Sequence, residues 1–171
     1  MLLFAHLGLT LAAGRFFAKA DLAFLALGSL LPDLIDKPLG WLVYGTPSMG
    51  RIYAHTLLFL MLLMVLAVVS WDIRLASLSG GVLAHLILDS MWNSPTTLFW
   101  PLRGPFPVVA EQLNTNDYIR QLLMGLHDPW ISVPELLGLA YLLYFAVQHK
   151  SRVFAGVKKL TGIEVPLGRQ L

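Results

Sequence analysis

TLLFLMLLMVLAVVSW, residues 56–71, is the most apolar stretch of the chain and carries no charged side chain. Asp72 and Arg74 close it on the C-terminal side. A helix needs roughly 20 apolar residues to span a bilayer, so this stretch predicts a membrane helix. Further apolar runs lie on both sides of it, at residues 1–14, 22–31, 75–92 and 133–147.

The composition also indicates a membrane protein. Hydrophobic residues make up 57% of the 171 residues and charged residues 13%, about half the charged fraction of an average globular chain. Too few charges remain to cover the surface of a soluble domain, and intrinsic disorder requires the opposite composition. We therefore expect an all-α, polytopic integral membrane helical bundle. It would form a single membrane-embedded domain over residues 1–171, with a basic C-terminal tail at 149–171.

The run at 22–31 is too short to span a membrane, because ten helical residues cover only about 15 Å. Pro32 follows it. Either the helix continues past Pro32 and carries Asp33 toward the membrane, or the segment is short or re-entrant. The run at 1–14 lacks the basic start of a signal peptide, so we interpret it as a retained helix. The sequence thus predicts about five membrane segments.

The charged residues predict an orientation in the cell (inner or plasma) membrane. With five passes, eight Lys and Arg residues fall on the face that holds the C-terminus, against four on the face that holds the long loops. Basic loops stay in the cytoplasm, so we expect a multi-pass protein with a cytoplasmic C-terminus. The net charge of +2 is too small to indicate a nucleic-acid partner. The absence of cysteine excludes thiolate metal ligands and disulfides.

Ionisable side chains inside or beside membrane segments are costly and usually functional. Taken singly, each has an ordinary structural interpretation, such as a helix cap for Asp33 or an interfacial histidine for His55. Taken together, they fall at one depth, and imidazole with carboxylate suits Zn²⁺, Mn²⁺ or Fe²⁺. We expect a divalent metal ion, Zn or Mn first, held by candidates from His6, Asp33, Asp36, His55, His85 and Asp89.

Four strings carry a family resemblance: GSLLPDLIDKP at 28–38, AHTLLF at 54–59, AHLILDSMW at 84–92 and LFWPL at 98–102, together with His6. They resemble the family of LexA-binding, inner-membrane-associated, metal-dependent hydrolases. The resemblance covers roughly residues 1–105 and implies metal chemistry in a membrane. Two departures bear on the number of ions: one more residue separates Asp33 from Asp36 than in many members, and Gly50 stands where many have a histidine.

We expect a membrane-embedded, metal-dependent hydrolase that acts on a phosphoester or related bond of a lipid-like substrate at the membrane interface. Asp36 would serve as general base and Arg51 would pair with a phosphate oxygen. The expected partners are the lipid bilayer and that substrate, with a homodimer possible in principle. The alternative is a metal-ion or proton-coupled membrane transporter or binding protein that uses the same Asp and His residues.

Overall fold

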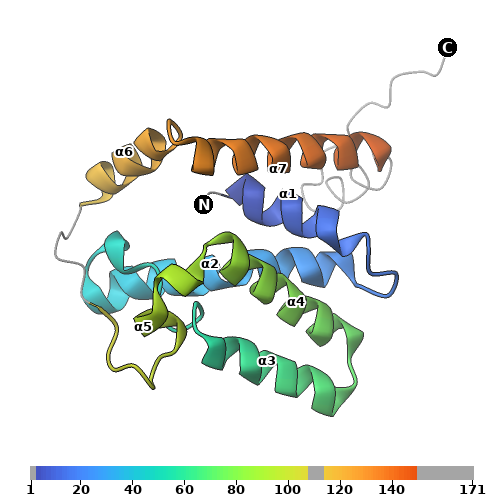
Figure 1. Ribbon diagram of the computed structural model, residues 1–171, viewed down its shortest axis with the longest axis horizontal. Helices are drawn as coiled ribbons and strands as arrows, with labels where there is room; N and C mark the ends of the chain where they lie inside the picture. The colour runs from blue at the N-terminus through green and yellow to red at the C-terminus, as the bar shows by residue number, and fades with distance from the viewer. Residues whose placement is uncertain (1–2, 108–113, 150–171) are drawn as a thin grey trace, which may run out of the picture.

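The computed structural model describes residues 3–107 and 114–149, and these residues form helices and turns without any strand. The predicted all-α class is confirmed over those two ranges. The predicted basic tail at 149–171 lies outside them, apart from His149. The helices are α1 (Leu3–Gly14), α2 (Leu22–Tyr44), η1 (Pro47–Met49), α3 (Leu57–Ser70), α4 (Ile73–Leu88), η2 (Met91–Asn93), α5 (Pro95–Leu98), α6 (Thr115–Gly125) and α7 (Pro129–Gln148), as Figure 1 shows.

The five long helices α1, α2, α3, α4 and α7 follow the five apolar runs of the sequence. Four of them begin at a side chain that accepts a backbone N–H of the first turn: Asp21, Thr56, Asp72 and Asp128. Such caps satisfy donors that have no partner within the helix. They fix where each helix starts, and therefore where the neighbouring loop residues lie.

Helix α2 does not stop at Pro32: of the two alternatives for this segment, the helix that continues past Pro32 is the one observed, and the short or re-entrant segment is not. Helix α2 runs for 23 residues and includes both Pro32 and Pro38. A proline removes one backbone N–H and opens the preceding turn, but a packed helix tolerates this loss when its neighbours bond the freed carbonyls. Asp33 and Asp36 consequently lie inside a continuous helix, and Asp33 is not a cap.

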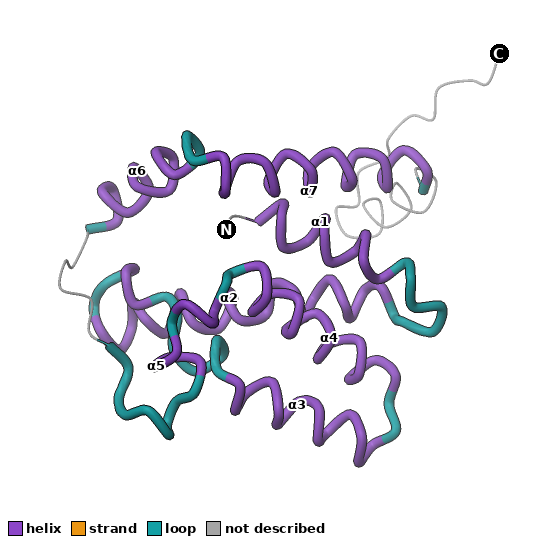
Figure 2. Tube along the Cα trace, in the orientation of Figure 1, coloured by secondary structure: helices purple, strands orange, loops and turns teal. Residues whose placement is uncertain are grey.

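Close helix contacts rest on glycine. A Cβ atom on Gly28 of α2 would meet the carbonyl of Leu78 on α4, and one on Gly8 of α1 would meet the carbonyl of Gly138 on α7. Small residues let helix backbones approach one another in membrane proteins. Figure 1 shows the resulting arrangement, with α7 along α1, α2 behind α4, and α3 on the outer side of α4. Figure 2 shows that most loops gather at the two ends of the long helices.

The core is small and the apolar surface is large. Leu60, Val82, Leu86 and Met91 form one buried cluster where α3, α4 and η2 meet, and Met49, Ile52 and Phe106 form a second. By contrast, α3 and α7 expose large apolar side chains along much of their length. Exposed apolar helix faces of this extent are typical of membrane or interaction surfaces.

By length and composition, α7 is the one helix among the described residues that could cross a membrane. Helices α1, α3 and α4 are apolar but shorter, at 12, 14 and 16 residues. Five complete spans therefore stay a prediction. Helix α7 also secures the N-terminal helix, since the buried Glu135 carboxylate accepts the backbone N–H groups of Phe4 and Ala5.

Candidate metal centre

The six sequence-predicted metal residues come together from four parts of the fold. His6 lies on α1, Asp33 and Asp36 on α2, and His55 in the loop just before α3. His85 is in the last turn of α4, and Asp89 is the residue that ends this helix. All three histidines are almost completely buried. Segments up to about 80 residues apart in sequence thus supply one compact polar cluster.

Asp36 organises the loop that carries His55. Its carboxylate is fully buried and accepts the backbone N–H groups of Ile52 (2.8 Å), Ala54 (2.9 Å) and His55 (3.1 Å). It also contacts Nδ1 of the His55 ring at 2.7 Å. A carboxylate on Nδ1 fixes the tautomer of a histidine and leaves the Nε2 lone pair for a metal. Asp36 therefore positions His55.

His85 is oriented in the same way by a backbone carbonyl. Its Nδ1 lies 2.7 Å from the carbonyl oxygen of Ser29. Ser29 belongs to the turn of α2 that precedes Pro32, where the helical hydrogen bonds are interrupted. This contact holds the second histidine, and Nε2 of His85 is left facing the cluster.

The two Nε2 atoms face each other at 3.1 Å. Two nitrogens bound to one tetrahedral Zn²⁺ at about 2.1 Å would lie about 3.4 Å apart. The separation therefore fits two imidazole ligands of a single ion. A third ring, that of His6, packs against His85 with 4.2 Å between ring centroids.

Two carboxylates complete the cluster. Asp33 Oδ1 lies 3.7 Å and Asp89 Oδ2 lies 3.9 Å from Nε2 of His55, and Asp89 Oδ1 is 3.2 Å from Nε2 of His6. Among the described residues, two sets have ligand atoms close enough to hold a metal, and both include His85. They are His6 with His85 and Asp89, and Asp33 with His55 and His85.

The YdjM inner membrane protein family has a sequence model that matches residues 1–158. The chain belongs to this family. The match places the protein in a family of inner membrane proteins, in agreement with its exposed apolar helices. Comparisons with curated proteins and with solved structures found no match.

A polar pocket of about 460 Å³ opens beside the cluster in this YdjM-family chain. Asp33 and Asp89 line it together with two cationic side chains, Lys37 and Arg51, and Tyr118 of α6 forms part of its wall. Lys37 contacts Asp33 at 2.7 Å, and Arg51 contacts Asp89 at 2.8 Å. Each carboxylate at the pocket therefore has a cation as its neighbour.

Asp89 remains ionised in this setting. Burial alone would raise its pKa, but the hydrogen bond from His6 and the positive charge of Arg51 outweigh burial. The net result holds the pKa of Asp89 well below the usual range of an aspartate. A carboxylate that stays charged when buried is suited to bind a cation.

The sequence prediction and the structure differ at Asp36 and Lys37. Asp36, expected as ligand and general base, lies outside the two sets that could hold a metal among the described residues. Its oxygens are engaged by the loop instead. Lys37 was not predicted as a site residue, although its spacing of four from Asp33 on a helix was a usable signal.

Proposed function

We propose that this YdjM-family chain is a metal-dependent hydrolase of phosphoester bonds in lipid-like molecules at the membrane surface. The observation that carries the proposal is the pair of buried imidazole Nε2 atoms 3.1 Å apart, each oriented through its Nδ1. His55, His85, Asp33 and Asp89 would hold the ion, with His6 orienting Asp89. A bound divalent cation would polarise an ester oxygen and lower the pKa of water.

Charge favours an anionic substrate once the metal is present. The site holds three carboxylates, those of Asp33, Asp36 and Asp89, and two cations, Lys37 beside Asp33 and Arg51 beside Asp89. With neutral histidines this leaves one net negative charge, and a divalent cation changes it to one net positive charge. The metal-loaded site would then attract a phosphodiester or phosphomonoester, whereas the metal-free site would repel it.

Lys37 and Arg51 would recognise the phosphate. Their side chains are about half exposed, at 47% and 48%, and both line the polar pocket. When Asp33 and Asp89 turn toward a metal, the two cations can donate to phosphate oxygens instead. The Oδ2 atom of Asp33, beside Lys37, can accept a proton from water in the pocket.

Metal analysis of the purified protein tests the site directly. We expect about one equivalent of Zn or Mn in the wild type and a near-complete loss in His85→Ala, because losing a ligand costs more affinity than the roughly 10- to 100-fold that losing a group behind a ligand costs. His127→Ala is the matched control, since His127 is exposed and bonds only the Met124 carbonyl among the described residues. Equal metal content in all three proteins would contradict the site.

Hydrolysis is tested with the metal-loaded protein in vesicles that contain phosphatidic acid and phosphatidylglycerol. Release of phosphate or of a phosphorylated headgroup, lost in His85→Ala, is the expected result. A metal-loaded protein that hydrolyses neither lipid but moves Zn²⁺ or protons across the vesicle membrane would instead support the transporter alternative.

A further inference from the structure

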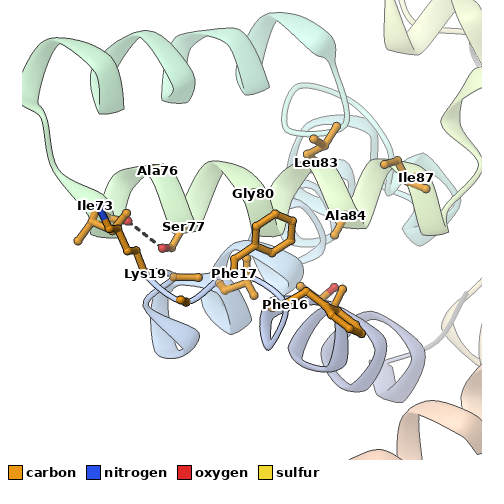
Figure 3. A pocket seen from close by; sticks show the side chains of 16 residues that line it. Phe16, Phe17, Lys19, Ile73, Ala76, Ser77, Gly80, Leu83, Ala84 and Ile87 are labelled. Atoms are coloured by element: carbon orange, nitrogen blue, oxygen red, sulfur yellow. Dashed lines mark hydrogen bonds between the residues drawn. The ribbon is translucent and has the colours of Figure 1, made fainter.

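A second, apolar cavity of about 650 Å³ runs along the opposite side of α4 from α3. Figure 3 shows it between α4 and the turn that connects α1 to α2. Phe16, Phe17 and Lys19 of this turn lie opposite Ile73, Ala76 and Gly80 of α4. Its lining is almost entirely apolar. We call it the α1–α4 groove. The small side chains of α4 leave it open, because Ala76, Gly80 and Ala84 follow one another at helical spacing.

One end of the groove lies next to the candidate metal centre. Ala84 and Ile87 line it; His85 directly follows Ala84, and Asp89 comes two residues after Ile87. On α1, the groove residue Thr10 lies one helical turn after His6 and therefore on the same face. The groove thus begins within about one turn of the metal residues on both helices.

The other end of the groove is far from the metal centre. Its lining on α4 extends from Ile87 back to Ile73, which is about 21 Å of helix. Half of the hydrocarbon thickness of a bilayer is about 15 Å. The groove is therefore long enough for the whole hydrocarbon chain of a membrane lipid.

We propose that the α1–α4 groove binds one hydrocarbon chain of a membrane lipid whose headgroup lies in the polar pocket at the metal centre. The inference rests on the proposed function for the place of the headgroup. The polar pocket contains Asp33, Asp89 and two cations, and the apolar groove begins beside His85 in sequence and one helical turn from His6, so the two cavities match the two halves of an anionic lipid.

Thr10 adds a polar contact near the headgroup end. Its side chain is 3% exposed, and its hydroxyl has no hydrogen-bond partner among the described residues. A buried hydroxyl without a partner is costly, so such a group usually meets a ligand or water. The Thr10 hydroxyl would donate to an ester carbonyl of the bound lipid, one helical turn from His6.

Photolabelling tests the groove without requiring turnover. The full chain is placed in phosphatidylethanolamine–phosphatidylglycerol vesicles that hold a small fraction of phosphatidic acid with a diazirine at the end of its acyl chain. Zn²⁺ is supplied so that the polar pocket can hold the anionic headgroup, and a phosphonate in place of the phosphate ester of the probe prevents turnover. We expect saturable labelling of the groove residues of α1 and α4, and only weak, non-saturating labelling of α3.

Two variants fill the groove at its middle and far end, Gly80→Leu and Ala76→Phe. A Cβ at Gly80 would meet only a Leu25 methyl group at ordinary contact distance, so the first variant can fold. Each should reduce groove labelling at least about tenfold, because several methylene groups of the lipid lose their burial. Ala140→Phe, on the exposed face of α7, is the matched control and should label like the wild type.

The outcomes separate this inference from the proposed function. Groove labelling that the two variants abolish supports lipid binding even if the metal-loaded protein hydrolyses nothing. Equal labelling of the groove and α3, or variants that label as the wild type does, would contradict lipid binding in the groove. If the metal-loaded protein hydrolyses the lipid in that case, the proposed function is still supported. A groove that stays unlabelled because residues 150–171 or a second copy cover it also overturns the inference.

Discussion

A single buried carboxylate, that of Asp36, determines where His55 lies. It holds three backbone N–H groups and one imidazole, so the loop before α3 is folded around it. The sequence marks Asp36 as an unusual charge but does not reveal these partners. They come from a loop whose path depends on tertiary packing, such as the close approach of Gly40 to the Met49 carbonyl.

We predict that Asp36→Asn lowers metal affinity about 10- to 100-fold, the usual effect of losing a group that orients a ligand. The amide presents N–H groups where the loop needs an acceptor, so we also expect about 1–3 kcal/mol of lost stability. Zinc titration and thermal unfolding measure the two effects. Asp117→Asn, on the exposed start of α6, is the control. Unchanged zinc affinity would show that Asp36 does not orient His55.

A different result is expected at Lys37, one of the two cations of the polar pocket. Lys37→Met should leave the metal content unchanged and slow phosphoester hydrolysis roughly 10- to 100-fold, because one charged hydrogen bond to the phosphate is lost. Steady-state hydrolysis of phosphatidic acid measures the rate. Arg74→Met, at the opposite end of α4, should retain the wild-type rate. A loss of metal in Lys37→Met would indicate a structural role instead.

At the scale of the elements, the sequence predicted which segments are helical better than it predicted where each helix begins and ends. The five apolar runs predicted the five long helices, because an apolar segment in a membrane must pair its own backbone N–H and C=O groups, and a helix does so. The limit of α2 was left open between a helix that continues past Pro32 and one that stops there, because proline normally favours a helix end. Packing against α4 through Gly28 and Gly81 overrides that local preference.

The start of α3 offers a test at the element scale. Thr56 accepts the N–H of Phe59 at 3.1 Å and donates to the Tyr53 carbonyl at 2.7 Å, directly after His55. Thr56→Ala should cost about 1–2 kcal/mol of stability, as the loss of an N-cap does. Thr56→Ser retains the hydroxyl and should recover most of it. Thermal unfolding in detergent compares the three proteins, and equal midpoints would argue against the cap.

On the scale of the whole molecule, a membrane protein was predictable from composition, but its spans were not. The lengths of α1, α3 and α4 fall short of a full crossing, and α7 alone among the described helices meets the length and composition test. A sequence shows which segments avoid water. It does not show how far each one reaches into the bilayer, because packing sets tilt and depth.

Orientation can be measured with single cysteines, because the chain has none of its own. Ser48→Cys lies in η1, near the candidate metal centre, and Ser151→Cys lies beyond the described residues. The distribution of Lys and Arg predicts that a membrane-impermeant thiol reagent labels Ser48→Cys from outside the cell and Ser151→Cys only after lysis. Labelling of both from one side would contradict five passes.

The contact of Gly8 with Gly138 has a consequence for suppressor genetics. A side chain at either position would strike the partner helix's main chain, which every amino acid possesses. A clash between two side chains can be relieved by shrinking the other one, but here no smaller replacement is available. A selection for function that starts from Gly8→Val should therefore return reversions at position 8 and no compensating change at position 138.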